Sequence, residues 1–169
     1  TYEDFAIDNI GEWTMVDRDY DFTYRINKDL ETYPYESDPK AFQVCNAKSL
    51  GIDIWPEGTP HSGNKFFMAM ANISYVNNDW MISPQLNGTS QVISFFAKAF
   101  TTQKGTTERL RVLYSTTDTD PAHFVQVSRG DYIELPETWT EYSFRLPEGA
   151  KYFAINCVSP GGEQSFALF

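Results

Sequence analysis

The stretch Asn78–Leu86, Asn-Asp-Trp-Met-Ile-Ser-Pro-Gln-Leu, decides the fold class that this sequence predicts. Its first part predicts a short strand over residues 79–83, which places Trp80 and Ile82 on one face and Met81 on the other. Pro84 has no backbone N–H to donate to a ladder, so strand pairing stops there or lies at a sheet edge. We therefore expect a short strand with a defined end.

A tight turn and a second, longer strand follow this stretch. The pair Asn87-Gly88 tolerates positive φ angles, which suits a tight turn. Residues 92–100 then alternate, and one face of this predicted strand carries four apolar side chains, Ile93, Phe95, Ala97 and Ala99. We interpret the two strands and the turn between them as the centre of a β-sandwich.

Shorter strand signals recur along the rest of the chain and are separated by turns rich in Pro and Gly. They cover residues 2–7, 13–16, 22–26, 42–44, 65–73, 110–114, 123–127, 132–135, 140–146, 152–158 and 165–169. Residues 27–63 contain four prolines and predict long irregular excursions. Because no window shows helical periodicity, the pattern predicts an all-β protein, an antiparallel sandwich of about ten short strands.

Composition narrows the classes of partner. The chain has 169 residues, which suit a single domain with its own core over residues 1–169. Its formal net charge of -10 argues against a nucleic-acid partner, since phosphate binding needs clustered Lys and Arg. No run is long or apolar enough for membrane insertion. The chain starts at Thr1 without a methionine and finishes on a strand-like segment, so we expect a piece excised from a longer protein.

The two cysteines, Cys45 and Cys157, lie far apart in the sequence. They could form one disulfide in an oxidising compartment or remain reduced as small buried residues. The strand pattern around Cys157 favours a buried thiol, and the absence of a Cys-x-x-Cys motif argues against a redox or cysteine-rich zinc site.

Five pieces of sequence, in order and spacing, resemble the cleaved-adhesin family. They are residues 79–84 (Asp-Trp-Met-Ile-Ser-Pro), 94–98 (Ser-Phe-Phe-Ala-Lys), 112–117 (Val-Leu-Tyr-Ser-Thr-Thr), 139–147 and 150–155. Members of this family are jelly-roll modules of bacterial cell-surface and secreted proteins, best known from the adhesin regions of gingipain-type proteases. The resemblance implies a jelly-roll β-sandwich of the galactose-binding-like or MAM-like type.

The resemblance also implies a function. It indicates a non-catalytic, extracellular adhesion module of a bacterial surface or secreted protein, which binds a host extracellular protein or a glycan. The alternative is a carbohydrate-binding module attached to a polysaccharide-degrading enzyme. Fold alone does not decide between these two functions.

Asp17, Asp19 and Asp21 form an alternating acidic triplet that could bind calcium. Carboxylates at this spacing converge on a hard cation when the backbone curls, whereas in a strand they would share one face and contact water. The resemblance favours calcium, because cleaved-adhesin modules often carry Asp-x-Asp-Gly-Asp here; this chain has Tyr20 at the glycine position. The resemblance also places Glu3, with its neighbour Asp4, where related jelly rolls have acidic ligands near the first strand.

Aromatic side chains in the irregular segment are the candidates for ligand binding. Tyr33, Tyr35 and Trp55 could stack on sugars or anchor a protein partner, with Asp53 among the nearby polar groups. Alternatively, these rings cover the ends of the sandwich. Three other tryptophans are expected in the core: Trp13, Trp80 and Trp139.

The sequence carries no catalytic motif. His61 and His123 lie in unrelated contexts, and neither a Gly-x-Ser-x-Gly elbow nor a phosphate-binding glycine loop is present. A pair of carboxylates for glycoside hydrolysis is defined in space and not in sequence, and none stands out here. We therefore predict that the chain is not an enzyme.

Overall fold

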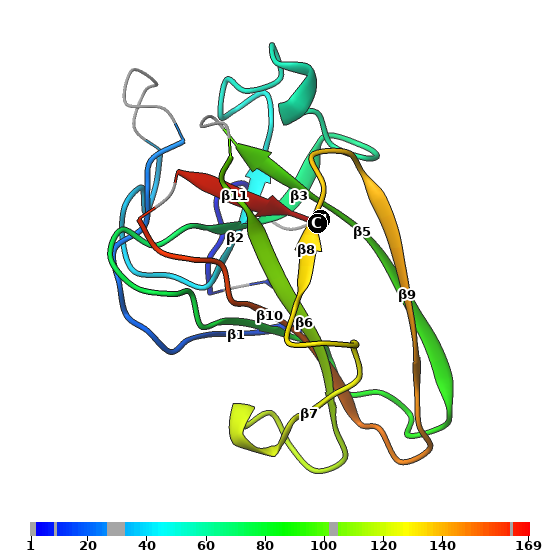
Figure 1. The fold of residues 1–169 in the computed structure, drawn as a ribbon. Coiled ribbons are helices and arrows are strands. Elements are labelled where there is room, and N and C mark those ends of the chain that lie inside the picture. Colours follow the sequence, from blue (N-terminus) through cyan, green and yellow to red (C-terminus); the bar gives the residue numbers. More distant parts are fainter. Residues whose placement is uncertain (1–2, 9, 27–32, 102–104, 163) are drawn as a thin grey trace.

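The computed structural model describes residues 3–8, 10–26, 33–101, 105–162 and 164–169. These residues form eleven β-strands and two short 3-10 helices (Figure 1). The elements are β1 Thr14–Asp17, β2 Phe42–Asn46, η1 Pro56–Gly58, β3 Lys65–Met70, β4 Asp79–Ile82, β5 Gln91–Thr101, β6 Glu108–Ser115, η2 Pro121–His123, β7 Val125–Gln126, β8 Ile133–Leu135, β9 Thr140–Leu146, β10 Tyr152–Cys157 and β11 Ser165–Leu168.

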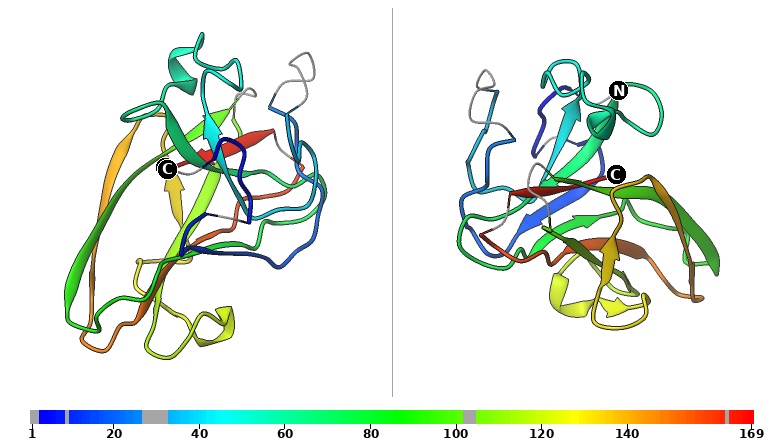
Figure 2. Two further views of the ribbon diagram at one scale, coloured as in Figure 1. Left: turned by 180° about the vertical axis from the view of Figure 1, so that it is seen from behind. Right: turned by 45° about the horizontal axis from the view of Figure 1, so that its top comes forward.

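Two antiparallel sheets pack face to face. The six-stranded sheet has the order β1-β4-β10-β6-β7, and β8 also pairs with β6; the five-stranded sheet has the order β2-β3-β11-β5-β9. Neighbouring strands in each sheet come from distant parts of the chain, as when β10 lies between β4 and β6 and β11 lies between β3 and β5. The predicted antiparallel sandwich is confirmed (Figure 2).

The turn at Gly88 joins the two sheets and does not close a hairpin. Gly88 has φ of 79°, as the Asn-Gly pair predicts. However, β4 lies in the six-stranded sheet and β5 in the five-stranded sheet. Met81 faces the core between the sheets, whereas Trp80 and Ile82 pack on the outer side of their sheet, so the predicted alternation is confirmed.

The core between the sheets combines large and small side chains. The six-stranded sheet contributes Leu110, Val112 and Ile155, and the facing strands of the other sheet contribute alanines. These alanines are Ala69, Ala97, Ala99 and Ala167. Small residues in the middle of one sheet let the large aliphatic side chains of the other sheet pack closely.

A second apolar layer covers the outer face of the five-stranded sheet. Met68, Phe100 and Phe166 point to this side and are covered by Ile26, Tyr33, Leu50 and Ile52 from the irregular segments. This layer explains why residues 65–70 are apolar on both faces. The predicted buried strand here is confirmed, although it stops at Met70.

Some predicted strands are wrong. Residues 3–7 form no strand, because Phe5 has φ of 66° and the backbone bonds to β2 are limited to those of Phe5 and Ala6 with Val44. Residue 2 lies outside the described residues. Residues 22–26 contribute only the isolated bridge between Thr23 and Asn72. The segment expected at 123–127 begins with η2 and leaves only the two-residue strand β7.

The other buried-residue predictions are partly confirmed. Both cysteines are free and buried, Cys45 in the outer layer and Cys157 between the sheets, so the disulfide does not form. Trp80 is 7% exposed, as expected for a core residue. Trp13 and Trp139 are only half-buried.

Phe166, in the short central strand β11, tests the double-sided packing of the five-stranded sheet. Its side chain is fully buried, with its ring centroid 6.0 Å from that of Phe100. We expect Phe166→Ala to lower the free energy of unfolding in urea by about 3–5 kcal/mol, because it leaves a cavity in the outer layer. Val125→Ala, at a position 56% exposed, should change it by only about 0.5 kcal/mol. Similar losses in both variants would contradict this packing.

Candidate functional site

The acidic segment after β1 curls and does not continue as a strand. The Asp17 Oδ1 atom accepts hydrogen bonds from the backbone N–H groups of Asp19 (3.1 Å) and Tyr20 (2.8 Å). Tyr20 has φ of 56°, the left-handed conformation that a glycine would adopt without strain. The strand-like alternative for this triplet is therefore wrong, and Tyr20 takes the conformation of the glycine that the resemblance expects at its position.

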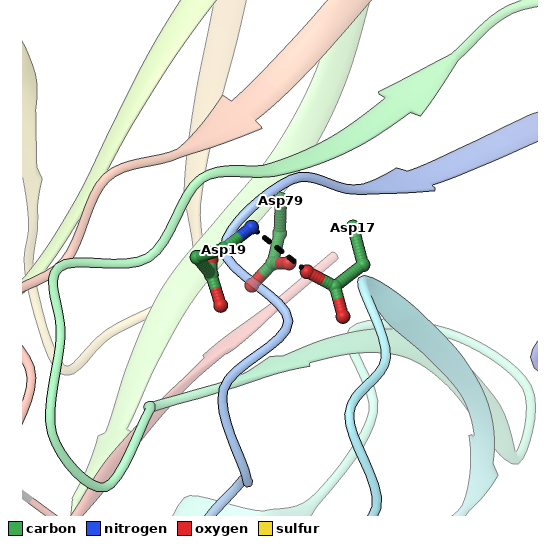
Figure 3. A group of neighbouring side chains, drawn as sticks. All are labelled: Asp17, Asp19 and Asp79. Atoms are coloured by element: carbon green, nitrogen blue, oxygen red, sulfur yellow. Dashed lines mark hydrogen bonds between the residues drawn. The ribbon is translucent and has the colours of Figure 1, made fainter.

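Three carboxylates converge at this curl. One oxygen each of Asp17, Asp19 and Asp79 lies within 4.8 Å of the other two (Figure 3). Asp79 begins β4 and lies directly opposite Asp17 in the antiparallel register of β1 and β4. Sequence reasoning missed Asp79, because only the pairing of these two strands brings it to the triplet.

Asp79 is the most unusual member of the acidic cluster. It is fully buried, and its Oδ2 atom accepts a hydrogen bond from Asn77 Nδ2 at 2.6 Å. Its Oδ1 atom has no hydrogen-bond partner among the residues that the structure describes. Burial, and then the negative charge of Asp19, raise the pKa of Asp79 well above its usual value. A buried carboxylate oxygen without a partner is costly unless a cation or a proton meets it.

Asp17 is also partly buried, and the nearby ammonium group of Lys40 forms its hydrogen bonds with other residues. Burial raises the pKa of Asp17; hydrogen bonding from the Tyr20 N–H opposes this shift, and the charge of Asp19 adds to it. The buried amine of Lys40 donates elsewhere, to Thr23 Oγ1 and to the Tyr35 carbonyl, both at 2.8 Å. Burial lowers the pKa of Lys40 to about 8. Within the described residues no lysine or arginine forms an ion pair with these three carboxylates, although the charge of Lys40 has a small lowering effect on the pKa of Asp79.

These side chains fit a hard divalent cation. Calcium prefers carboxylate and carbonyl oxygens and accepts irregular geometry with six to eight ligands. Asp17, Asp19 and Asp79 could hold such an ion, which would pair with the buried Oδ1 atom of Asp79 and relieve the repulsion among the carboxylates.

The other two predicted metal ligands lie outside this cluster. Asp21 accepts backbone hydrogen bonds from Ser74 (2.7 Å), Tyr75 (2.9 Å) and Phe22 (2.9 Å). Burial alone would raise the pKa of Asp21, but these three donors outweigh it and lower that pKa. Glu3 is exposed and is not among the acidic groups that converge within the described residues. Of the four predicted metal ligands, the structure therefore brings together Asp17 and Asp19 but not Asp21 or Glu3.

Five apolar side chains are exposed on two loops beside the acidic cluster. Residues 20–22 form one loop and residues 73–76 the other, and the Phe22 carbonyl accepts a hydrogen bond from the Ile73 N–H at 2.9 Å. We call these side chains the loop patch; they are Tyr20 (76% exposed), Phe22 (59%), Ile73 (43%), Tyr75 (67%) and Val76 (60%). Sequence reasoning missed the loop patch because its two halves are far apart in the chain.

The predicted aromatic site is not formed as expected. Tyr33 is 8% exposed, stacks on Phe5 and points its hydroxyl at Met70 Sδ, 3.8 Å away, so its expected display is wrong. Trp55 is half-buried, with its ring stacked on Phe100. Both rings help to cover the five-stranded sheet, as the alternative expects.

The other two members of the predicted aromatic site remain at the surface. Tyr35 is 48% exposed, and Asp53 is exposed. These two residues are therefore accessible, but the structure does not gather the four predicted residues into one exposed site.

Comparison by sequence finds no family model and no curated protein that matches the chain. Comparison by structure finds the K2 cleaved adhesin domain of Lys-gingipain, with 17% identity over 93% of this chain and 86% of that chain, at a TM-score of 0.65. The K1 cleaved adhesin domain of Lys-gingipain from Porphyromonas gingivalis W83 matches at 17% identity and a TM-score of 0.62, over 94% and 87% of the two chains.

A carbohydrate-binding domain has a similar fold. TmCBM61, solved in complex with β-1,4-galactotriose, matches at 10% identity and a TM-score of 0.51, over 99% of this chain and 94% of that chain. At these identities the likeness shows the fold alone. The predicted jelly-roll sandwich and the resemblance to cleaved-adhesin modules are confirmed at the level of the fold. Among the residues that the structure describes, no helix has the length and apolar character to cross a membrane.

The acidic cluster predicts a calcium-dependent melting temperature. At a calcium concentration about 100 times the Kd, we expect the melting temperature to exceed that in chelator by roughly 5–10 °C, because binding stabilises only the folded state. Asp79→Asn should abolish most of this difference, since it keeps the shape and removes the charge, and Asp19→Ala should diminish it. Asp118→Asn, which changes an exposed carboxylate that pairs with His123, is the control and should retain the full difference. Equal melting temperatures of the parent chain in calcium and in chelator would contradict calcium binding at the acidic cluster.

Proposed function

We propose that residues 1–169 form one non-catalytic binding module of an exported bacterial protein, in which a calcium centre supports a ligand-binding loop patch. The ligand is an extracellular protein or a glycan of a host. The observation that carries this proposal is the exposure of five apolar side chains on two loops that the acidic segment ties together. The resemblance to cleaved-adhesin modules, supported at the level of the fold, adds the extracellular setting.

The loops of the patch are held in place by carboxylates. Asp19 accepts hydrogen bonds from Asn72 Nδ2 (2.7 Å) and from the Asn78 N–H (2.5 Å), at the two ends of the second loop. Asp21 accepts the N–H groups of Ser74 and Tyr75 in the middle of that loop. A preordered binding surface loses less conformational entropy on association, which favours affinity.

Gly161 packs against the backbone of the loop of residues 73–76. A Cβ atom at this position would lie 2.1 Å from the Tyr75 carbonyl oxygen, so the two backbones approach as closely as only a glycine permits. The Gly162 N–H also donates to the Asn72 carbonyl at 2.9 Å. Tyr75 and Val76 are therefore exposed on a loop whose backbone is held by packing and hydrogen bonds.

The chemistry of the loop patch suits recognition. Tyrosine rings offer a flat apolar face and a polar hydroxyl, and they are common at binding sites for proteins and sugars. A cluster of exposed apolar side chains on a soluble domain usually marks an interaction site. Calcium bound at Asp17, Asp19 and Asp79 would hold the first loop and reduce the negative charge next to the patch.

The surroundings of the potential nucleophiles and bases support a non-catalytic role. His61 lies flat on Phe96, and His123 pairs with the exposed carboxylate of Asp118. Burial raises the pKa of both Cys45 and Cys157, which keeps these thiols protonated and unreactive. Asp118 orients the His123 ring as it would orient a base, but within the described residues no hydroxyl or thiol is hydrogen-bonded to that ring.

The proposal predicts calcium-dependent binding that the loop patch controls. A glycan array and a pull-down from extracellular-matrix proteins, each in calcium and in chelator, would identify the ligand. Tyr75→Ala and Tyr20→Ala should then weaken binding by about tenfold or more, as expected for aromatic residues at the centre of an interface. Tyr132→Ala is the matched control, because Tyr132 is 40% exposed and lies against Arg109, outside the loop patch.

The same measurement separates the proposal from its alternative. A glycan that quenches tryptophan fluorescence in the parent protein but not in Trp55→Ala, and whose binding Tyr75→Ala leaves unchanged, would support a carbohydrate-binding module that uses Trp55, Tyr35 and Asp53. An affinity that is unchanged by chelator and by the loop-patch variants would contradict the proposed site.

A further inference from the structure

Strand β9 is the open edge of the five-stranded sheet. The opposite edge, β2, is covered, because the Phe5 N–H donates to the Val44 carbonyl at 2.8 Å and the Val44 N–H donates to the Ala6 carbonyl at 2.9 Å. Strand β9 pairs with β5 on one side, and within the described residues no strand pairs with its other side (Figure 1). Strand β5 lies between this edge and β11.

The hydrogen bonds of β5 show which groups of β9 face this edge. Lys98 lies opposite Leu168 of β11, and its neighbour Ala99 donates its N–H to the Pro136 carbonyl at 2.8 Å, on the β9 side. Backbone directions alternate along a strand, so residues 93 and 95 exchange hydrogen bonds with their β9 partners, residues 144 and 142. The N–H and C=O groups of residues 141, 143 and 145 therefore point to the open edge.

A groove of about 550 Å³ lies beside the open edge. One wall is residues 141–145 of β9, and the other wall consists of Val127, Arg129 and Ile133 from the six-stranded sheet and its loop. Tyr142 and Phe144 face this inner side and are half-buried. Their rings stack on Phe95, with centroid separations of 5.8 and 6.2 Å. The groove therefore gives access to an aromatic layer at the margin of the core.

The outer face of β9 carries two charges of opposite sign. Glu141 and Arg145 are exposed, and within the described residues neither forms an ion pair. Four residues of extended chain separate them by about 13 Å, so the two side chains cannot pair with each other. Ser143, which is also exposed, lies midway between them.

We propose that β9 pairs with β9 of a second copy of this chain, antiparallel and with Ser143 on the two-fold axis. This register places Glu141 opposite the partner's Arg145 on the outer face, and Tyr142 opposite the partner's Phe144 on the inner face. Each pair occurs twice because the interface is symmetric. Opposite charges and aromatic rings directly across an antiparallel ladder stabilise it. The two five-stranded sheets would then form one continuous sheet.

The charges select this register and this occupant. A two-fold axis at residue 141 would place two glutamates opposite each other, and an axis at residue 145 would place two arginines opposite each other. A parallel pairing in register would bring like charges side by side at both positions. Like charges across a ladder are destabilising. The segment Glu-Tyr-Ser-Phe-Arg over residues 141–145 is thus complementary to its own reverse, which favours a second copy over an unrelated strand.

This interface is separate from the proposed ligand site. The acidic cluster and the loop patch lie beside β1 and β4, and Figure 1 shows β1 and β9 on opposite sides of the molecule. Dimer formation is therefore a further property, independent of calcium. It would join two copies of the loop patch in one particle, which raises the avidity for a ligand that presents repeated sites.

Exchange of the two charges tests the proposal. In sedimentation velocity at concentrations up to about 0.5 mM, the parent chain should form a dimer in calcium and in chelator alike. Glu141→Arg and Arg145→Glu should each weaken this dimer by about tenfold or more, because each places like charges opposite each other at two points. The double variant has the net charge of the parent and should dimerise within about threefold of it. An equimolar mixture of the two single variants should also recover a dimer, since their charges are complementary at both positions.

Hydrogen exchange and a backbone variant locate the contact. At high concentration the amides of Glu141, Ser143 and Arg145 should exchange about tenfold or more slowly than in dilute solution, whereas those of Tyr142 and Phe144, which face β5, should not change. Ser143→Pro removes an N–H that β5 does not use, so it should abolish the dimer and keep the circular dichroism of the parent. Ser143→Ala should dimerise like the parent.

Two results would overturn the proposal. One is a parent chain that stays monomeric at every concentration. The other is a dimer that both single charge reversals leave unchanged, because such a dimer would use a different face. The charge variants keep the test decisive even where Ser143→Pro fails to fold, since they alter only exposed side chains.

Discussion

The antiparallel pairing of β1 with β4 positions the candidate metal centre. Its register places Asp17 opposite Asp79 and carries the chain into the curl that brings Asp19 to the same point. Asp21, two residues further along, then accepts the N–H groups of Ser74 and Tyr75 in the loop of residues 73–76. A shift of this pairing by one residue would move every side chain of β1 to the other face of the sheet. The acidic cluster and the loop patch would both be lost.

Burial of Asp79 makes this arrangement more than a solvated acidic surface. A carboxylate in contact with water is stabilised by hydration, whereas the Oδ1 atom of Asp79 has neither water access nor a donor within the described residues. The buried ammonium group of Lys40 donates its hydrogen bonds to Thr23 and to two backbone carbonyls. A divalent cation would satisfy the remaining oxygen and link the β-sheet to the exposed loops. Stability and recognition would then depend on the same ion.

The two sheets differ in how they use their outer faces. The six-stranded sheet carries only a small outer cluster, around Trp80 and Phe124. The five-stranded sheet is covered by the irregular segments that contain Tyr33 and Trp55, and this covering removes most of the aromatic site that the sequence suggests. The five-stranded sheet is therefore covered on its outer face by a larger apolar layer than the six-stranded sheet.

The sequence by itself determined the all-β class, the alternation of Trp80, Met81 and Ile82, and the positive φ at Gly88. These features depend on side-chain periodicity and on local backbone preferences, which short stretches of sequence carry. It also indicated that Asp17 and Asp19 belong to one acidic site. Only the tertiary structure decided that Asp79 joins them, that Asp21 braces a loop instead, and that Tyr33 is buried. The physical reason is that these outcomes depend on pairing between strands and loops far apart in the chain, and the cost of burying a group depends on the partners that such pairing brings to it.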